Sequence, residues 1–452
     1  MSDTIAAVST GMQVSAIGIL RLSGDEAINI VDKLFIPRSG KKMSESEDRK
    51  LVFGSLCDLD GQTLDICLCT ISRAPHSYTG ENTAELQCHG SPAVLRAALD
   101  AVFALGARQA LPGEFTKRAF LNGRMDLTSA EAVADIIDAE TAEAAKNAAG
   151  QLGGAIGRRI DKIYDFLTDL SSHYHAVLDY PDEDIEDFTL EAYKAELHAA
   201  IAELRRLADS YSGGKLLYGG IPAAIIGRPN AGKSSLLNAI LGYDRAIVTN
   251  IPGTTRDTIE EKLRLGGVLL RLTDTAGLRE TDDEIERLGV MRSHEAMENA
   301  ELVIAVIDGS GEVSAEDEEI IRCAEKAPHA VVAVSKSDLG KKAVLPETTL
   351  PVVELSSVTG EGLEKLADTI KAIFPMPDAP AGEILTNARQ AEAVDRALAA
   401  LTAAYDALLQ GCTPDIVLTE AEGAMSALGE LSGKTVRENV TNRIFERFCV
   451  GK

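Results

Sequence analysis

The segment Gly227-Arg228-Pro229-Asn230-Ala231-Gly232-Lys233-Ser234 decides the fold, because it is a complete G-x-x-x-x-G-K-[ST] phosphate loop. It directly follows the apolar run 221–226 and precedes the helical pattern 236–240. The glycines of such a loop let backbone N–H groups approach phosphates, and the helix N-terminus faces the anion. Lys233 is expected to reach the β and γ oxygens, and the Ser234 hydroxyl to ligate Mg²⁺. The chain is therefore expected to bind a nucleoside triphosphate.

Strands and helices alternate around this loop. Residues 268–273, 302–307 and 330–334 are apolar runs typical of buried parallel strands, and charged helical stretches separate them. The Pro-rich segment 375–382 ends the pattern. We predict a Ras-like doubly wound α/β domain with a parallel sheet, spanning residues 218–377.

The N-terminal residues 1–120 have a different pattern of apolar and polar residues. Residues 16–22 and 65–71 alternate as strands do, and 93–104 has the helical period. This mixture predicts an N-terminal α+β domain.

An Ala-rich helical pattern begins at Thr128, where Thr128 and Glu131 have capping-box spacing. The pattern persists to Leu217 and resumes at 387–410, beyond the α/β segment. We therefore predict an all-helical domain of two parts, residues 121–217 and 378–452, into which the α/β domain is inserted.

Length and composition narrow the class of protein. A chain of 452 residues is expected to form about three domains. Its net charge of −25 argues against tight binding to a polyanion by this chain alone. If the substrate is a nucleic acid, a partner protein is expected to provide many of the contacts to it. No apolar run reaches ~18 residues and the N-terminus lacks a basic lead, so we expect a soluble, cytoplasmic protein with no membrane segment.

The seven cysteines include no C-x-x-C pair, which predicts reduced thiols and no zinc. Cys67 and Cys69 are two apart in a strand and are expected to share a buried face. His89 is expected to be structural. The acidic segment 179–187 is either a cation site or a solvated turn, and the turn is favoured.

Three further motifs follow the phosphate loop in the order of a guanine-nucleotide domain. Asp274-Thr275-Ala276-Gly277 is expected near Mg²⁺ and the γ-phosphate. In Ser335-Lys336-Ser337-Asp338 the carboxylate is placed to accept from guanine, although Asn is usual at the first position. Ser356-Ser357-Val358 is expected to be the last base-contacting turn, with Ser357 where Ala is usual. Each motif alone is equally an ordinary strand-end turn, but four in order favour a GTPase (G) domain.

The segment Gly253-Thr254-Thr255-Arg256-Asp257 lies where switch I belongs, and Thr255 is expected to ligate Mg²⁺. Leu278 stands where Ras-like GTPases carry the Gln that orients water, so another polar group must take that role. The stretch 282–286 offers candidates.

Longer segments carry a family resemblance. G-R-P-N-A-G-K-S-S, P-G-T-T-R-D and D-T-A-G-L-R resemble the potassium-activated GTPases of the tRNA-modification, Era and Der group. The segment 112–127 and the terminal Phe448-Cys449-Val450-Gly451-Lys452 are similar to the signatures of MnmE (TrmE), a family of bacterial tRNA-uridine-modifying GTPases. The resemblance spans the whole chain.

That resemblance implies a homodimer formed through the N-terminal domain and a one-carbon folate, 5-formyl- or methylene-tetrahydrofolate, bound in it. It also implies an FAD-containing partner, MnmG (GidA), in a heterotetrameric complex. The pair would build an aminomethyl or carboxymethylaminomethyl group on C5 of wobble uridine 34, the tRNA being held mainly with the partner. The folate residues implied are Arg21, Glu85, Arg124 and Lys452, of which position 124 is commonly Lys in the family. Cys449 resembles the family's tail cysteine, a candidate for either reactivity or packing.

The resemblance also implies a K⁺ ion in the place of an arginine finger. Its expected ligands are Asn230, Thr249, Ile251 and Thr254. Glu286 aligns with the family's catalytic Glu, with Asp283 and Glu284 as alternatives. The expected GTP-binding residues are Asn230, Ala231, Gly232, Lys233, Ser234, Ser235, Thr249, Asn250, Ile251, Pro252, Gly253, Thr254, Thr255, Asp274, Thr275, Ala276, Gly277, Ser335, Lys336, Asp338, Ser356, Ser357 and Val358.

Two other classes of protein compete with this interpretation. A ribosome-assembly GTPase switch of the Era or Der type would add a basic RNA-binding tail or a second phosphate loop, and the sequence has neither. A dynamin-like remodeller would need an apolar or polybasic membrane segment, which is also missing from the sequence. We therefore expect an enzyme that couples GTP hydrolysis to uridine modification.

Overall fold

The structure is a computed structural model, and it describes residues 3–179, 190–243, 261–272, 300–340, 342–375, 377, 379–435, 444–446 and 448–452. The chain divides into two compact units. The first comprises Met1–Ile137, Gly150–Ala200 and Arg396–Lys452, and the second comprises Asp138–Ala149 and Ile201–Asp395. The domain boundaries predicted from the sequence stay a prediction.

The first unit contains a seven-stranded sheet in the order β3-β4-β5-β6-β2-β1-β7. Neighbouring strands are antiparallel except for β1 and β7, which are parallel. The strands are β1 Ile5–Val8, β2 Ser15–Ser23, β3 Phe35–Pro37, β4 Val52–Cys57, β5 Thr63–Ser72, β6 Thr83–Gly90 and β7 Arg108–Gln109. The predicted α+β character is confirmed.

Helices α1 (Ala27–Leu34) and α2 (Pro92–Ala104) pack on one face of this sheet, and the 3-10 turn η1 (Met43–Glu45) lies against α1. Alternation along the strands turns Leu20, Cys67, Cys69 and Leu86 toward these helices. The expectation that Cys67 and Cys69 share a buried face is therefore confirmed. The opposite, open face of the sheet carries exposed apolar side chains, including Ile17, Phe53 and Ile66.

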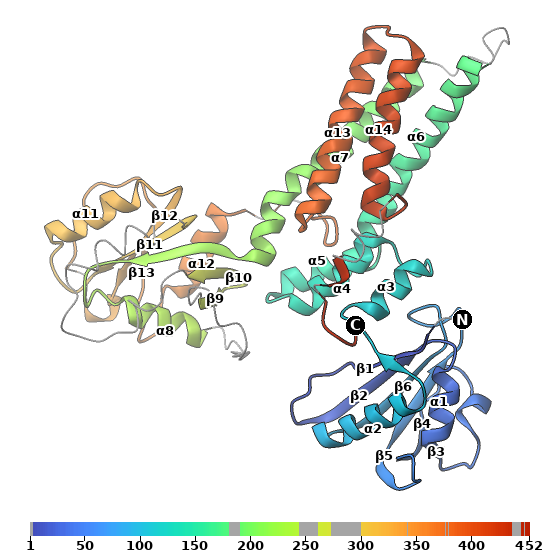
Figure 1. The fold of residues 1–452 in the computed structure, drawn as a ribbon. Coiled ribbons are helices and arrows are strands. Elements are labelled where there is room, and N and C mark those ends of the chain that lie inside the picture. The colour runs from blue at the N-terminus through green and yellow to red at the C-terminus, as the bar shows by residue number, and fades with distance from the viewer. Residues whose placement is uncertain are drawn as a thin grey trace. The chain divides into compact units, whose positions relative to one another are not determined.

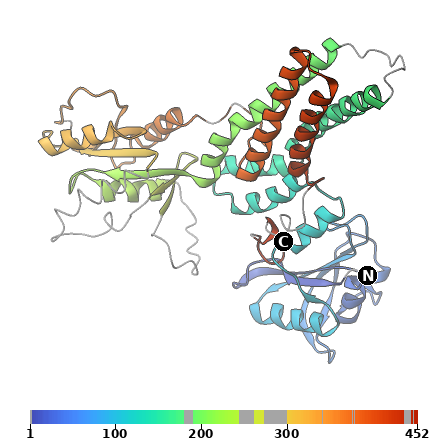
Figure 2. The ribbon, with the colours of Figure 1, turned by 45° about the horizontal axis from the view of Figure 1, so that its top comes forward.

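The helices beyond this sheet are α3 Glu114–Leu121, α4 Leu127–Asp138, α5 Ala142–Leu152, α6 Ala155–Asp179, α7 Leu190–Gly219, α13 Ala388–Leu409 and α14 Pro414–Ser432. In the first unit α14 runs along α6 (Figures 1 and 2). The acidic segment predicted as a turn begins at the last residue of α6, Asp179, and its residues 180–187 lie outside the described part of the chain. Within the described residues, no helix combines the length and apolarity needed to cross a bilayer.

The predicted capping box at Thr128 is wrong. Helix α4 begins at Leu127, so Thr128 lies inside its first turn. The carboxylate of Asp126 accepts from the Ser129 amide at 2.6 Å and from the Thr128 hydroxyl at 2.8 Å. A short carboxylate one residue before the helix reaches the free amide of the first turn, and Asp126 therefore caps α4.

The second unit contains a six-stranded sheet in the order β13-β12-β11-β8-β10-β9. Its strands are parallel except for β9, an antiparallel edge strand. The elements are β8 Ile221–Ile226, α8 Lys233–Tyr243, β9 Glu261–Leu265, β10 Val268–Leu272, β11 Leu302–Asp308, α11 Ala315–Ala324, β12 His329–Ser335, η2 Ser337–Leu339, β13 Val352–Glu354 and α12 Leu363–Ile373.

Both faces of this sheet are buried. Ile304 and Val306 of β11 pack into a core with α8 and α12, while Val303 and Ala305 pack into another with α11. Alternate residues of one strand thus enter two cores, which explains why the strand sequences are continuously apolar. The predicted doubly wound sheet is confirmed, and its strand ends position the nucleotide motifs.

Candidate functional site

The phosphate loop joins β8 to α8, and two of its glycines are sterically required. A Cβ on Gly227 would lie 2.5 Å from the carbonyl oxygen of Val306, closer than any side chain tolerates. Gly232 has φ +101°, a left-handed conformation that favours glycine. Asn230 also has positive φ, at 61°. The loop therefore turns tightly and brings its backbone amides toward the N-terminus of α8.

Lys233 lies inside this turn. Its Nζ donates to the carbonyl oxygens of Gly227, at 2.7 Å, and Arg228, at 2.9 Å. Burial lowers the pKa of the Lys233 ammonium. Ser234 and Ser235 follow it in the first turn of α8 and are exposed. The loop thus holds a cation beside accessible hydroxyls, an arrangement suited to phosphates and Mg²⁺.

The S-K-S-D motif at the end of β12 contacts the phosphate loop directly. The buried Ser335 hydroxyl donates to the carbonyl oxygen of Ala231 at 2.5 Å. Lys336 Nζ donates to the carbonyl oxygen of Asn230 at 2.9 Å. Two of the four sequence motifs are therefore joined by hydrogen bonds, and the unusual Ser335 has a defined structural role.

Asp338, the last residue of the S-K-S-D motif, contacts the Ser356-Ser357-Val358 motif. Its Oδ1 accepts from the Ser356 hydroxyl at 2.7 Å, and the Ser356 oxygen accepts from the amides of Val358 and Thr359 at 3.3 and 3.2 Å. Asp338 itself is exposed. Within the described chain the buried Ser357 hydroxyl has no hydrogen-bond partner. A carboxylate beside an unsatisfied hydroxyl suits a polar ring such as guanine.

Sequence reasoning missed Asp308, the last residue of β11. Its carboxylate accepts from Lys336 Nζ at 2.7 Å. Burial opposes ionisation of Asp308, but hydrogen bonds from Lys336 and Ser310 outweigh it and lower the pKa to about 2. The sequence did contain a signal for this residue. Asp308 is a carboxylate at the carboxyl end of a predicted parallel strand, and the ligand sites of such sheets lie at these ends.

Sequence reasoning also missed Arg228, which anchors the phosphate loop to helix α11. Its Nε lies 3.1 Å from Oδ1 of Asp317, which is fully buried. Asp317 also closes a capping box with Ser314 at the start of α11. The phosphate loop is therefore attached to both β12 and α11.

Several predicted residues lie outside the described part of the chain. Ser234 is the described member of the Mg²⁺ pair with Thr255, and Asn230 is the described member of the K⁺ set. The predicted residues outside the described ranges are Thr249, Asn250, Ile251, Pro252, Gly253, Thr254, Thr255, Asp274, Thr275, Ala276, Gly277, Leu278, Asp283, Glu284 and Glu286.

A second candidate site lies on the open face of the N-terminal sheet. Arg21 on β2 pairs with Glu85 on β6, with Nε 2.8 Å from Oε1. The Arg21 guanidinium also lies 5.7 Å from the ring centroids of both Tyr78 and Phe115. Sequence reasoning missed these two rings. Phe115 is fully buried, whereas Tyr78 is 40% exposed, so Tyr78 offers the apolar surface beside a cation that suits an aromatic ligand with carboxylates.

The C-terminal tail docks at this site. The Lys452 carbonyl oxygen accepts from the Phe115 amide at 3.1 Å, and the Gly451 carbonyl oxygen accepts from the Ser9 hydroxyl at 2.9 Å. The Gly451 oxygen also lies 3.5 Å from Nη1 of Arg21. The structure therefore brings together Arg21, Glu85 and the backbone of Lys452.

Arg124 lies beside the loop that carries Tyr78. A Cβ placed on Gly80, two residues after Tyr78, would lie 3.3 Å from Cγ of Arg124. Cys449 is exposed, and its carbonyl oxygen accepts from the Gly113 amide at 3.3 Å. His89 lies within β6 and is exposed.

A network of charged side chains surrounds Glu114, next to the Phe115 amide that binds the C-terminal tail; we call the region of Arg21, Glu85 and the docked tail the tail site. Glu114 accepts from Arg108, from Arg118 and from the Leu111 amide. Burial opposes ionisation of Glu114, but these hydrogen bonds outweigh it and lower the pKa. Because Phe115 is the next residue, the network fixes the segment that receives the tail.

The chain is similar over its whole length to proteins of one family. Two family models match: MnmE helical domain over residues 127–449, and GTP-binding protein TrmE N-terminus over 4–124. A tRNA modification GTPase MnmE from Symbiobacterium thermophilum is 42% identical, covering 100% of this chain and 99% of the relative. Another protein of that description, from Clostridioides difficile, is 39% identical and covers 100% of both chains.

Solved structures give a weaker comparison. The G domain of the T. maritima FeoB iron transporter is 30% identical and covers 34% of this chain and 96% of its own. Its TM-score of 0.24 is too low to support an inference about this fold. The similarity to known proteins therefore rests on the two family models and on the full-length relatives.

Proposed function

This chain belongs to the MnmE family of tRNA modification GTPases, and we propose that it couples GTP hydrolysis to modification of wobble uridine 34. As a member of that family it is a GTPase. The observation that carries the proposal is the convergence of three motifs: Ser335 and Lys336 bond to the phosphate loop, and Ser356 bonds to Asp338. Mass spectrometry of wobble uridines in tRNA from a deletion strain tests the coupling. Unaltered uridines would refute it.

Guanine selectivity is proposed to rest on Asp338. An ionised carboxylate accepts from the ring N–H and the exocyclic amine of guanine, which adenine does not offer in that pattern. Xanthine has a carbonyl in place of the amine, so Asp338→Asn should exchange preference from GTP to XTP. Binding of both nucleotides to the wild type and the variant measures this. An unaltered preference would move base recognition elsewhere.

Hydrolysis is proposed to use K⁺ and Glu286. K⁺, held by Asn230, Thr249, Ile251 and Thr254, would supply the positive charge that an arginine finger supplies elsewhere. Asn230 supports this assignment, because it is exposed and its backbone is anchored through Lys336. Glu286 is proposed to orient the attacking water, because the apolar Leu278 has no hydrogen-bonding group.

The tail site is proposed to bind 5-formyl- or methylene-tetrahydrofolate. Arg21 and Glu85, which are paired, would contact the same end of the ligand, with Glu85 accepting from the donors of its pterin ring, and Lys452 would hold its carboxylates. The partly exposed Tyr78 ring beside Arg21 supports a flat aromatic ligand. The tail 431–452 also carries five basic and two acidic residues, which favours an anion.

A homodimer is proposed to form through the open face of the N-terminal sheet. Ile17, Phe53 and Ile66 are 59%, 46% and 54% exposed there, although each is a large apolar residue. Arg21 and Glu85 project from the same face, so a second copy would cover the folate site. An Ile17→Asp variant, measured by light scattering, should be monomeric, and a dimer of unchanged affinity would contradict this surface.

An FAD-containing partner of the MnmG (GidA) type is proposed to complete the enzyme. The net charge of −25 supports this, because a strongly acidic chain needs help to hold tRNA. Co-purification with the partner, with and without tRNA, tests the proposal. Tight tRNA binding by this chain alone would contradict it.

A further inference from the structure

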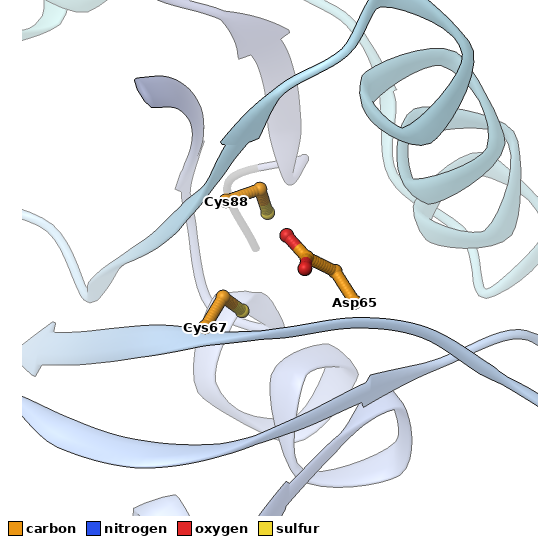
Figure 3. Close-up of side chains that lie close together, drawn as sticks. All are labelled: Asp65, Cys67 and Cys88. Carbon is orange, nitrogen blue, oxygen red and sulfur yellow. The ribbon is translucent and has the colours of Figure 1, made fainter. Parts of the chain in front are cut away.

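Two cysteines and an aspartate gather at the end of the β5–β6 pair. Asp65 and Cys67 belong to β5, and Cys88 belongs to β6. One carboxylate oxygen and both sulfur atoms lie within 4.8 Å of one another. Figure 3 shows the three side chains pointing toward a common centre.

The cluster forms where the two strands stop pairing. The β5–β6 ladder runs from Leu68 opposite Gln87 to Ser72 opposite Thr83 and ends just before Cys67 and Cys88. Beyond the end of the ladder, a side chain replaces the backbone hydrogen bond between the two strands. Oδ2 of Asp65 on β5 accepts from the backbone amide of His89 on β6 at 2.8 Å. Strand geometry, rather than a loop, therefore fixes the positions of all three side chains.

Burial makes the cluster chemically unusual. Cys67 and Cys88 are 5% and 2% exposed, and the Asp65 side chain is 10% exposed. Oδ1 of Asp65 lies 2.8 Å from Nδ1 of His89, whose own side chain is 75% exposed. The thiols are thus shielded from solvent, while Asp65 and His89 leave a path to it.

We propose that Asp65, Cys67 and Cys88 bind a zinc ion. Zn²⁺ takes thiolate sulfur at about 2.3 Å and carboxylate oxygen at about 2.0–2.2 Å in a tetrahedron, so three ligands within 4.8 Å need only small adjustment. Two sulfur ligands select zinc over Mg²⁺ or Ca²⁺. His89 orients the Asp65 carboxylate from outside, as partners of metal-bound groups commonly do.

This inference departs from the expectation of no zinc, which rested on the lack of a C-x-x-C pair. The ligands come from two strands, so local spacing does not reveal them. A metal here would clamp β5 to β6 where their backbone hydrogen bonds end. Ile17, which lies opposite His89 on β2, and Ile66, which lies between the two β5 ligands, would be held in place by the same clamp.

The test is Co²⁺ titration of the reduced, metal-free, full-length protein. Cobalt bound to thiolates gives a near-ultraviolet charge-transfer band that an oxygen-only Mg²⁺ site cannot give. About one equivalent should saturate the band, and Zn²⁺ should displace it. No band in the wild type, or a Cys67–Cys88 disulfide that forms in place of metal binding, would overturn the proposal.

Matched variants locate the ion. Cys88→Ala should abolish the band, whereas Cys69→Ala, an equally buried thiol on β5, should keep it. Cys449→Ser, which removes an exposed thiol, should also keep it. His89→Gln should weaken cobalt binding by about 10- to 100-fold. If Cys88→Ala fails to fold by circular dichroism, Asp65→Asn replaces it as the test. A band of full strength in a folded Cys88→Ala protein, or unchanged cobalt affinity in a folded Asp65→Asn protein, would refute this ligand set.

Discussion

The Ser335 hydroxyl donates a hydrogen bond to the carbonyl oxygen of Ala231 at 2.5 Å, which ties the end of β12 to the phosphate loop. The same hydroxyl lies 3.2 Å from the carbonyl oxygen of Ile307, so it bridges β11, β12 and the loop. A small buried hydroxyl thus links the base side of the nucleotide site to its phosphate side.

Ser335→Ala should weaken GTP and GDP binding by roughly fivefold. It removes one hydrogen bond worth about 1 kcal/mol and leaves the Ala231 carbonyl oxygen without this donor. Ser337→Ala is the matched control, because within the described chain the buried Ser337 hydroxyl has no partner. Fluorescent-nucleotide titration measures both. Equal effects of the two substitutions would deny Ser335 its bridging role.

GTP turnover should be faster in KCl than in NaCl at equal ionic strength. The proposed ion replaces an arginine finger, a group worth ~10³ to 10⁵ in rate in other GTPases. Asn230→Ala should abolish the difference between the salts while nucleotide still binds. Steady-state phosphate release measures the rates, and equal rates in the two salts would exclude K⁺ activation.

Glu286→Ala should keep nucleotide affinity and lower kcat by ~10² or more, the usual effect of losing a positioned catalytic group. The residue lies outside the described part of the chain, so this prediction rests on sequence alone. Single-turnover hydrolysis separates the chemical step from binding. A variant with wild-type kcat would transfer the role to Asp283 or Glu284.

Deleting Val450–Lys452 should weaken 5-formyltetrahydrofolate binding tenfold or more. The deletion removes Lys452, and it also removes the Gly451 carbonyl beside Arg21. One charge-assisted hydrogen bond contributes ~1.5 to 3 kcal/mol, which accounts for that loss. Calorimetry measures folate binding, with GTP binding as the internal control. Full-strength binding by the truncated chain would remove the tail from the site.

Glu114 should make the N-terminal domain sensitive to acid. Its pKa is lowered in the folded state, so its stabilising effect is complete above the unfolded value, near 4.5, and is lost as the pH falls through the folded value. Glu114→Gln should cost about 1.5–3 kcal/mol of unfolding free energy at pH 7 and flatten this acid dependence.

The control for Glu114 is Glu47→Gln, which changes an exposed carboxylate paired with Lys50. It should leave the acid dependence as it is, because exposed pairs contribute little. Thermal melts followed by circular dichroism from pH 3 to 7 compare the variants. Identical profiles for wild type and Glu114→Gln would show that the Arg108 and Arg118 contacts do not stabilise the domain.

Local sequence patterns determined much of this protein. The phosphate loop, the continuously apolar strands of the α/β domain and the alternation of Cys67 and Cys69 all follow from the spacing of residues along one element. Such spacing fixes which side chains share a face, because the period of a strand or helix is set by its backbone. The order of the nucleotide motifs likewise predicted which strand ends carry the site.

Only the tertiary structure decided which distant residues meet. Lys452 reaches Phe115, Asp308 holds Lys336, and Cys88 faces Cys67, although none of these pairs shares an element. The cap of α4 shows that even short-range patterns can mislead. Asp126 and Thr128 are both residue types that cap helices, and in the structure Asp126 accepts from the free Ser129 amide. Strand order and tail docking arise from contacts between segments that are remote in sequence. Their free energy depends on the burial of whole faces, which no local pattern contains.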